Sequence, residues 1–475
     1  MYAGFFRLGV LAVEPCAPFG ETRGTTLGEG AGFVVLERLE LRERRGWGFV
    51  NGYGLASDAW HETSPEPRGE GIARAMRGAL SDAGLPPEAV GYVNAHATGT
   101  AANDDAEWRG IQRALGHPVP ISGSKSFLGH AQGAAGVLEL LATMVCMREG
   151  TIPPTLRVGR GRPSGPPDPV AGEAPRPAAI DHALSNSAAF GGANAVLCIG
   201  RAASERADLG REVRVVGLGL VETAPGEARD EAALAALAEG VDLRSTDPSA
   251  RLALAASIAA LRDAGLRVKG ALRDRAGIFA GSTRVSPASA LEYRESIERG
   301  GLGRVSVAAF ARLVLHAPAG AVSRLVSLRG PTTTLCDEAV AGLLAVAYAA
   351  DHLARRDDAD VLLAVGFDER PSDAALEEGA ACLVLSATGA GPRVRGAASA
   401  GAGRIERAID EALARAGLSR ADVEAWVRPE PAGGAPSLRS ARSAIDAARA
   451  IREGARVAVA AGDGPSASCA IVLAS

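Results

Sequence analysis

Lysine, aromatic residues and long apolar runs are scarce in this sequence. Of its 51 basic residues only Lys125 and Lys269 are lysines, and aromatic residues make up 4% of the chain. A net charge of −4 argues against nucleic acid or an anionic membrane as the main partner. No run reaches the roughly 20 uninterrupted apolar residues that a membrane span needs, so none is expected.

The six cysteines are far apart and form no Cys-x-x-Cys pair, which indicates neither a zinc site nor a disulfide framework. The apolar N-terminus has no basic region before it, is interrupted by Arg7 and shows no small-residue cleavage site, so it does not read as a signal peptide. We expect a reduced, cytoplasmic setting. Because the chain opens on apolar residues without a preceding strand or helix signal, we interpret it as a protein entered in its middle.

The chain is rich in small and apolar residues. Hydrophobic residues make up 47% of its 475 residues, and there are 59 glycines. This composition suits helices packed closely on sheets, in two or three domains. Residues 31–40 (AGFVVLERLE) predict a buried strand, and residues 71–85 predict a helix that ends at a glycine.

Further elements alternate in the same way. After His130 a helix is expected whose first turn holds only small residues, so that another backbone can approach it closely. Residues 151–177 form a Pro/Gly loop long enough to be functional. Residues 182–200 return to turn and strand. Strands alternating with helices predict an α/β sheet with helices on its faces.

The chain also repeats itself. A second α/β block begins at residue 213, after a charged linker over 204–212. Residues 377–386 (EEGAACLVLS) repeat the pattern of residues 28–37 (GEGAGFVVLE), and residues 409–427 repeat residues 76–94. Repetition at this separation indicates related domains rather than a solenoid.

Two histidines and one of the two lysines lie close together in the sequence, in Gly-rich and apolar surroundings. His96 stands in "VNAHATGTAAND", and Lys125 and His130 stand in "GSKSFLGHAQGAAG". A lysine kept in an arginine-rich chain suggests a need for a compact ammonium. A metal site is the weaker alternative, because the His-x-His, His-x-x-His and HExxH spacings are absent. These residues alone do not exclude the alternative that both histidines are core residues whose hydrogen bonds are satisfied and that have no catalytic role.

Taken together, these motifs resemble the β-ketoacyl-acyl-carrier-protein synthase family, the condensing enzymes of fatty-acid and polyketide assembly. Residues 1–203 are similar to the C-terminal half of such an enzyme, in "LGEGAGFVVLE", "YVNAHATGTAANDDAE", "SGSKSFLGHAQGAAGVLE", "IPPTL" and "LSNSAAFGGANAVL". Residues 213–475 resemble a shortened, eroded member of the family, with an N-terminal half over 213–376 and a C-terminal half over 377–475. The resemblance implies a thiolase-like fold, in which similar halves are layered helix on sheet.

The resemblance also assigns roles, and it implies no cofactor. His96 and His130 match the pair that promotes decarboxylation and stabilises the enolate and the oxyanion. Lys125 matches the lysine that orients this pair, and Glu139 matches the glutamate that holds the lysine. Asp104 and Glu107 match acidic residues expected to be structural. Phe190 matches a gating phenylalanine, although simple core packing is nearly as good an interpretation. The residues concerned are His96, Lys125, His130, Glu139, Asp104, Glu107 and Phe190.

The sequence departs from the family pattern in several places. Ala97 stands where the family usually has glycine, and Ala188 and Ala189 stand where a Phe-Gly pair is common. In the second block the position of the nucleophilic cysteine falls on Ala339. Cys336 lies three residues too early and is expected to be a small buried residue. The position equivalent to His96 falls at Pro429.

The resemblance therefore implies part of a decarboxylative condensing enzyme that lacks its own nucleophilic cysteine. The second block resembles a chain-length factor, the inactive partner of a ketosynthase. Expected partners are acyl carrier protein and a ketosynthase or its N-terminal half, in a dimer or pseudo-dimer. Two alternatives remain: a scaffold without chemistry, and a permuted synthase in which residues 1–203 pair with residues 213–370, against which Ala339 argues.

Overall fold

The computed structural model describes the chain except for residues 22, 42–45, 206–207, 239–240, 244–245, 285, 338, 372–375 and 430–434. The chain forms two compact units. Unit 1 comprises Met1–Ala207 with Gly300–Val307, and unit 2 comprises Asp208–Arg299 with Ala308–Ser475. Among the residues described, no helix is both long and apolar enough to cross a membrane.

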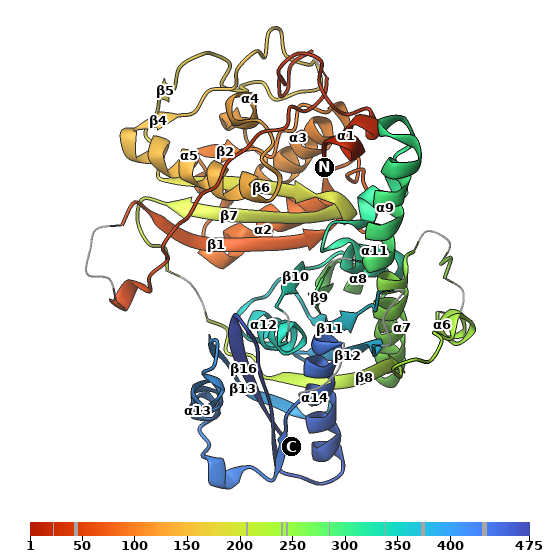
Figure 1. The fold of residues 1–475 in the computed structure, drawn as a ribbon. Coiled ribbons are helices and arrows are strands. Elements are labelled where there is room, and N and C mark those ends of the chain that lie inside the picture. Colours follow the sequence, from red (N-terminus) through yellow and green to blue (C-terminus); the bar gives the residue numbers. More distant parts are fainter. Residues whose placement is uncertain are drawn as a thin grey trace. The chain divides into compact units, whose positions relative to one another are not determined.

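Unit 1 is built on a mixed sheet of five strands in the order β1-β7-β6-β2-β3 (Figure 1). β7 pairs antiparallel with β1 and β6, and β2 lies parallel to β6 and β3. The strands are β1 (Phe49–Ser57), β2 (Tyr92–Asn94), β3 (Ile121–Ser122), β6 (His182–Ala189) and β7 (Ala193–Gly200). A separate ladder joins β4 (Thr151–Ile152) to β5 (Arg176–Pro177).

Both faces of this sheet carry helices. Because side chains alternate along a strand, Val93 and Leu184 join the core formed with α2 and α3, whereas their neighbours Tyr92 and Ala183 join the core formed with α5. The helical elements of unit 1 are α1 (Tyr2–Leu8), η1 (Leu39–Leu41), α2 (Glu70–Ala83), η2 (Pro87–Ala89), α3 (Ala101–Leu115), α4 (Lys125–Leu128), η3 (Gln132–Ala134), α5 (Ala135–Glu149), η4 (Phe190–Gly192) and η5 (Leu302–Arg304).

The sequence predictions for unit 1 have mixed outcomes. The helix predicted over 71–85 is confirmed as α2, which ends where Gly84 adopts the left-handed conformation, with φ 64°. The buried strand predicted over 31–40 is wrong. Residues 31–38 form no strand and appear in Figure 1 as a red trace without an arrow. Phe33 and Val35 are 91% and 89% exposed, because no neighbouring strand of the described chain pairs with this apolar segment.

Unit 2 contains a sheet of nine strands in the order β10-β9-β11-β12-β8-β13-β16-β15-β14. These strands are β8 (Val213–Thr223), β9 (Ala276–Ser282), β10 (Thr332–Cys336), β11 (Val361–Asp368), β12 (Glu378–Ser386), β13 (Arg393–Gly401), β14 (Ala425–Val427), β15 (Val457–Asp463) and β16 (Ala467–Ala474). Its helical elements are α6 (Glu231–Leu237), α7 (Pro248–Asp263), α8 (Leu272–Arg275), α9 (Pro287–Gly300), α10 (Val307–Arg312), α11 (Ala317–Val326), α12 (Ala341–Arg355), α13 (Ile405–Ala416), η6 (Arg420–Asp422) and α14 (Pro436–Arg452).

One strand arrangement occurs three times in the chain. The order β8-β12-β11-β9-β10 repeats β1-β7-β6-β2-β3 with the same parallel and antiparallel pairings. The order β13-β16-β15-β14 repeats its first four strands. Because β12 completes the second copy, we place the boundary between the second and third copies at residues 387–392, after rather than before β12.

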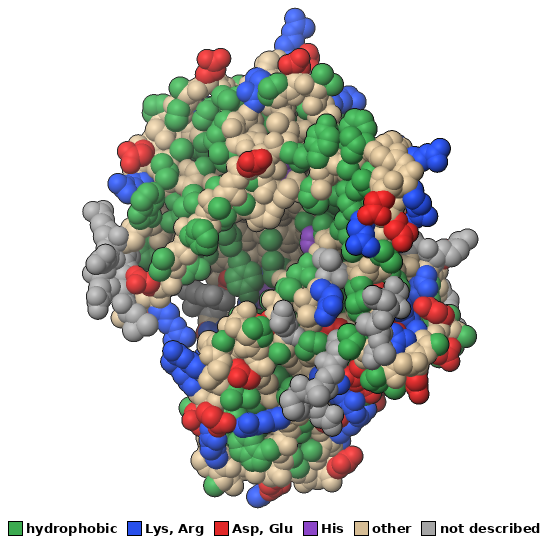
Figure 2. All heavy atoms as spheres, viewed as in Figure 1, with side chains coloured by type: hydrophobic (Ala, Val, Ile, Leu, Met, Phe, Trp, Pro, Cys, Tyr) green, Lys and Arg blue, Asp and Glu red, His purple; other side chains and the backbone are tan. Residues whose placement is uncertain are grey.

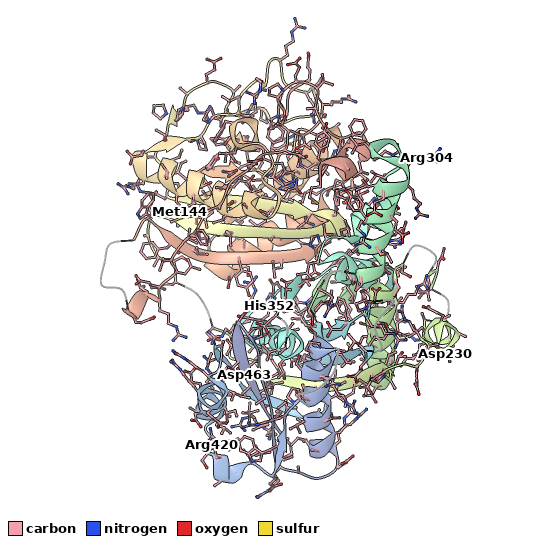
Figure 3. All side chains as sticks on the ribbon, viewed as in Figure 1. Met144, Asp230, Arg304, His352, Arg420 and Asp463 are labelled. Carbon is pink, nitrogen blue, oxygen red and sulfur yellow. The ribbon has the colours of Figure 1, made fainter. Side chains whose placement is uncertain are left out.

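Helices separate the layers of unit 2. α7 packs on β8, β11 and β12, and α13 packs on β13, β15 and β16. Between them α12 and α14 contact each other and strands of both copies. His352, labelled in Figure 3, belongs to α12 and bonds Asp358 through Nε2 at 2.7 Å. The layered helix-and-sheet architecture expected from the resemblance is confirmed.

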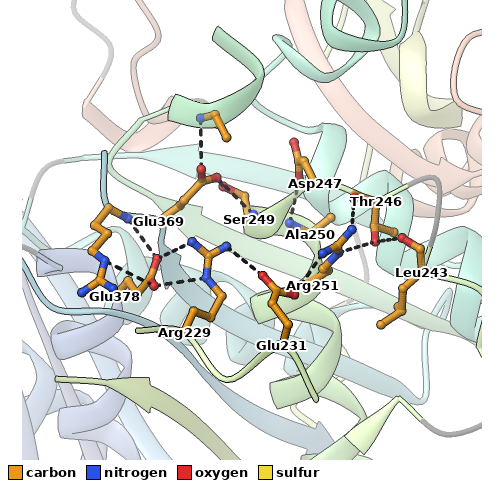
Figure 4. A network of polar contacts seen from close by, with 12 residues as sticks. Arg229, Glu231, Leu243, Thr246, Asp247, Ser249, Ala250, Arg251, Glu369 and Glu378 are labelled. Carbon is orange, nitrogen blue, oxygen red and sulfur yellow. Dashed lines mark hydrogen bonds and ion pairs between the residues drawn. The ribbon is translucent and has the colours of Figure 1, made fainter. Parts of the chain in front are cut away.

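A buried polar network holds the start of β12 (Figure 4). The Glu378 carboxylate is fully buried and forms ion pairs with Arg229 at 3.0 Å and Arg370 at 3.5 Å. In the same region Glu369 accepts hydrogen bonds from the hydroxyls of Ser249 and Ser286. These contacts tie β12 and the end of β11 to the beginning of α7.

Candidate functional site

The site begins where the chain leaves β2. Glu107 of α3 accepts hydrogen bonds from the backbone N–H of His96 at 2.6 Å and of Ala97 at 2.7 Å. Asn186 of β6 donates to the same carboxylate. Burial raises the pKa of Glu107 to about 7, and these hydrogen bonds oppose the rise. Glu107 therefore holds the backbone on which His96 stands.

Ala97 occupies an unusual backbone conformation, with φ 39°. This left-handed region favours glycine, and it explains why a glycine would be usual at this position. The space around Ala97 is also tight. A Cβ atom built on Gly123 would come within 2.8 Å of the Ala97 Cβ, so Gly123 has to remain glycine beside this alanine.

Lys125, the first residue of α4, is almost completely buried and bridges three groups. Its Nζ donates to the backbone O of His96 at 2.6 Å, lies 3.3 Å from His96 Nδ1 and forms an ion pair with Glu139 of α5. An ammonium has only donors, so His96 Nδ1 must accept. The proton of a neutral His96 is therefore on Nε2, which makes Nε2–H a donor.

His130 is positioned by backbone contacts. Its N–H donates to Thr26 O at 2.7 Å, and it forms a parallel bridge with Leu27. The rings of His96 and His130 meet edge to face, with centroids 5.5 Å apart and planes at 87°. His130 Nδ1 is buried without a hydrogen-bond partner among the residues that the structure describes.

Both imidazoles are neutral at pH 7. Burial and then the nearby Lys125 ammonium lower the pKa of His130 to about 3. The same two causes, followed by His130, hold the pKa of His96 well below its usual value. Burial raises the pKa of the Glu139 carboxyl, and Lys125 opposes that rise. The cluster thus offers neutral imidazole donors beside one buried cation.

Asp104 lies one turn before Glu107 on α3. Its carboxylate accepts from the backbone N–H of Phe19 at 3.0 Å and of Gly99 at 3.1 Å, and it forms an ion pair with Arg162 at 3.2 Å. Arg162 belongs to the predicted Pro/Gly loop and was not among the predicted site residues. No motif in the sequence marks it, because its pairing with Asp104 arises only in the folded chain.

Phe190 lies at the turn between β6 and β7, in η4, and is half-buried. Its ring centroid is 5.9 Å from that of Phe5 in α1. The structure therefore brings six of the predicted residues into two adjoining clusters, on α3, α4 and α5 and on the segments that follow β2 and α4. It places Phe190 against α1, and a gating role for this residue stays a prediction.

The corresponding region of unit 2 has a different chemistry. Ala339 lies just before α12, and its backbone N–H donates to Oδ1 of Asp337 at 3.2 Å. Val340 N–H donates to the same oxygen at 3.3 Å. Asp337 therefore accepts from both residues that directly precede α12, although α12 itself has no side-chain cap. Gly462 separates Val340 from Pro429, since a Cβ atom there would lie 3.2 Å and 3.4 Å from their side chains.

The expectation for Cys336 is wrong. It was predicted to be buried, and it is exposed at the end of β10, where its Sγ donates to Thr283 O at 3.5 Å. β10 is the last strand of its sheet, so one side of it has no strand neighbour to cover the sulfur. Within the described part of the chain, no group of three or more His, Cys, Asp or Glu side chains is arranged to hold a metal ion.

Two family models match the chain. The model described as "Beta-ketoacyl synthase, C-terminal domain" matches residues 47–159, and the model described as "Beta-ketoacyl synthase, N-terminal domain" matches residues 194–404. The C-terminal domain thus precedes the N-terminal domain along this chain. The first match contains the His96, Lys125 and His130 cluster, and the second contains Ala339.

Curated relatives match over a shorter region. The 3-oxoacyl-[acyl-carrier-protein] synthase 2 of Synechocystis is 41% identical over 209 residues, covering 41% of this chain and 50% of the relative. The protein of the same name from Coxiella burnetii is 40% identical over 184 residues, covering 38% of this chain and 44% of the relative. The chain therefore spans about half the length of the curated relatives that it matches.

One solved structure resembles the whole chain. The structure titled "PfaC Keto synthase-Chain length factor" matches with a TM-score of 0.75 and 17% identity, covering 100% of this chain and 67% of that one. At this identity the likeness is one of fold. It extends over both units and agrees with the thiolase-like architecture.

Proposed function

Because this chain belongs to the β-ketoacyl synthase family, we propose that unit 1 supplies the histidine half of a decarboxylative condensing site, to be completed by a cysteine from an N-terminal half-domain. The substrates are acyl and malonyl thioesters, carried on acyl carrier protein as the names of the curated relatives suggest. The geometry of Lys125 carries this proposal, since it fixes His96 as a neutral Nε2–H donor.

The reaction needs such donors at two points. Loss of CO2 from the malonyl thioester leaves an enolate whose oxygen carries the negative charge. The enolate carbon then attacks the acyl thioester carbonyl, a carbon–carbon bond forms, and the cysteine thiolate leaves. His96 and His130 stabilise the enolate oxygen through N–H donation, and removing one donor of this kind typically costs about 10² to 10³ in rate.

Lys125 acts by positioning. Its ammonium is shared between the His96 backbone, His96 Nδ1 and Glu139, so it is held away from a role as a free proton donor. Glu107 and Asp104 keep the surrounding backbone in place. Lys125, Glu139, Glu107 and Asp104 are all buried and make the contacts described above, which suits rigid preorganisation of the histidines.

For unit 2 we propose a role like that of a chain-length factor, which shapes the complex without forming an acyl-enzyme. Ala339 supplies no nucleophile at the start of α12. The Asp337 carboxylate occupies two backbone N–H groups there, and Pro429 offers no imidazole. This observation also supports the alternative that the whole chain is a scaffold that binds a ketosynthase or carrier protein.

A two-by-two assay separates these functions. The full chain is supplied with a cysteine-bearing N-terminal half-domain of a β-ketoacyl synthase or with buffer, and His130 is intact or replaced by alanine. Ketoacyl product is measured by mass spectrometry. His61→Ala, at an exposed histidine of unit 1, is the matched control. Product that requires the half-domain and His130, and is unchanged by His61→Ala, supports condensation, whereas its absence in every case leaves only the scaffold.

A further inference from the structure

The long loop that joins β4 to β5 carries two arginines whose side chains hold other parts of unit 1 (Figure 1). Arg157 and Arg162 each donate hydrogen bonds to backbone carbonyls outside the loop. Arg160 stands between them, and its exposed side chain makes no hydrogen bond or ion pair with any residue that the structure describes. Two arginines of this loop are therefore engaged, and the third provides a control.

Arg157 holds the start of α4. Its guanidinium donates to the carbonyl of Ser126, the residue after Lys125, and through Nε and Nη2 to the carbonyl of Cys16 at 3.3 and 3.1 Å. The Cys16 thiol in turn donates to the Lys125 carbonyl at 3.2 Å. One planar fork of donors thus fixes two consecutive carbonyls of α4, the second directly and the first through Cys16.

The same contacts reach His130. The backbone N–H of Cys16 donates to Thr26 Oγ1 at 2.8 Å, and Thr26 O accepts from the backbone N–H of His130 at 2.7 Å. α4 is only four residues long and has no side-chain cap, so these outside contacts hold it in place. A displacement of Arg157 would therefore be passed to Lys125 and His130 together.

Arg162 holds the loop that follows His96. Its side chain, which is 8% exposed, donates to Gly20 O at 2.7 Å and to Gly99 O at 2.9 Å, and it forms an ion pair with Asp104 at 3.2 Å. Asp104 accepts from the N–H of Gly99 at 3.1 Å. Both polar groups of the Gly99 backbone are thus fixed by one buried ion pair.

The backbone of the loop fixes the spacing between the two arginines. Arg157 adopts the left-handed conformation, with φ 59°, and Gly159 and Gly161 share it, with φ 61° and 70°. Val158 is 4% exposed, and its carbonyl accepts from the N–H of Gly161 at 3.1 Å. A residue with a Cβ atom stays in this conformation only where its surroundings determine it. This part of the loop is therefore a compact turn.

Both imidazoles are enclosed by the protein. His96 is 7% exposed, and only small parts of histidine side chains are visible on the face drawn in Figure 2. The rings of His96 and His130 lie with their centroids 5.5 Å apart, so a small shift of either backbone segment changes where its ring nitrogen points. Donors of this kind stabilise a transition state only when they are aimed at the atom on which charge develops.

We propose that Arg157 and Arg162 are positioning residues of the condensing site. Each holds one of the two segments that carry a histidine, and the turn between the arginines sets how the two imidazoles lie relative to each other. This inference rests on the proposed function for what the histidines do, although the contacts themselves do not depend on it. Charge alone is not sufficient, because a lysine would offer a single point donor in place of the fork.

Hydrogen exchange of the full chain, followed by mass spectrometry of short peptides, tests the contacts without any substrate. The backbone N–H groups of Gly129 and His130 donate to carbonyls within this arrangement. In Arg157→Met their exchange should be about 30-fold faster, as expected for the loss of a hydrogen bond from a charged group, whereas exchange in α2 should not change. Arg160→Met is the matched control and should leave both regions unchanged.

Arg162 should act on the other segment. Arg162→Lys keeps a positive charge beside Asp104 and so avoids leaving that buried carboxylate unpaired. It should speed the exchange of the Gly99 amide by a similar factor and leave Gly129 unchanged. Each arginine would then control its own segment, which a general loss of stability would not produce.

The ring of His96 separates positioning from stability alone. NMR of isotopically labelled histidine rings should show the proton of His96 on Nε2 in the unchanged chain, with the signal assigned by its loss in His96→Gln. Arg157→Met should add a second signal with the proton on Nδ1, because the Lys125 ammonium is no longer kept beside that atom. In the half-domain assay the same variant should lower kcat about 10- to 100-fold with KM unchanged.

The contrary outcomes are distinct. The inference is overturned if Arg157→Met exchanges at Gly129 and His130 like the unchanged chain, if Arg160→Met speeds exchange equally, or if the His96 signal stays single. Should Arg157→Met fail to fold by circular dichroism, Arg157→Lys is measured in its place against the same criteria. If the unchanged chain makes no ketoacyl product with the half-domain, the proposed function fails, while hydrogen exchange and the ring signal still decide the positioning role.

Discussion

The Lys125 ammonium lies 3.3 Å from Nδ1 of His96, and it also forms an ion pair with the Glu139 carboxylate. Burial and this nearby cation keep the imidazole neutral, and the cation leaves its proton on Nε2. The side chains of Lys125 and Glu139 are 1% and 2% exposed, so neither charge is solvated by water. The pair therefore contributes to both stability and the state of His96.

Removing one charge of this pair should lower the free energy of unfolding more than removing both charges. We expect Lys125→Met to destabilise unit 1 by about 3–5 kcal/mol, because it leaves the Glu139 carboxylate buried without its partner. Lys125→Met with Glu139→Leu should recover part of that loss. Urea unfolding followed by the fluorescence of the buried Trp108 measures this, in a chain whose Trp47, Trp60 and Trp426 are phenylalanine. A double variant as unstable as the sum of the two singles would contradict the coupling.

Unit 1 should lose stability in acid partly through His130. Its pKa in the folded state is about 3, below the usual value near 6.5. Below pH 6.5 the unfolded chain therefore binds a proton that the folded chain does not, so the free energy of unfolding falls as the pH drops from 6.5 towards 3. His130→Gln should flatten this dependence, since it removes one titrating group. Equal slopes for both chains between pH 6.5 and 4 would show that His130 is not the cause.

The chain should form no acyl-enzyme by itself. No cysteine stands at position 339, and Cys336 is exposed at the end of β10, three residues before that position. Incubation with acyl-carrier-protein thioesters should leave the intact mass unchanged. Labelling with N-ethylmaleimide is the control, because Cys336 should react with it and Cys336→Ser should abolish that reaction. An acyl thioester found on Cys336 would refute the interpretation of unit 2.

A cysteine placed at position 339 should be unreactive for an identifiable reason. The Asp337 carboxylate accepts from the backbone N–H of residue 339, and its negative charge disfavours a neighbouring thiolate. We therefore expect the thiol of Ala339→Cys to have a higher pKa than the same thiol in the double variant with Asp337→Ala. The pH dependence of alkylation by iodoacetamide measures both. Identical alkylation profiles would contradict the electrostatic explanation.

Much of this structure could be predicted from short stretches of sequence. The helix over 71–85 and its end at Gly84 follow from apolar periodicity and a terminal glycine, and both are local properties. The repeat of residues 28–37 in residues 377–386 pointed to related domains, and strand order bears this out. The motifs around His96 and Lys125 also predicted the candidate site residues, because residue types and their spacing can be read from the sequence itself.

Only the tertiary structure decided which of those stretches are buried, paired into sheets or brought close to a charge. The apolar pattern of residues 31–40 is that of a buried strand, but a strand needs neighbours to accept its hydrogen bonds, and the described chain pairs none with it. The exposure of Cys336 depends on β10 being the edge of its sheet. The neutral state of His96 depends on its burial and then on Lys125, which is 29 residues away in sequence and 3.3 Å away in space. Residue types and periodicity are properties of the chain alone, whereas burial, strand pairing and charge proximity arise only when distant segments meet.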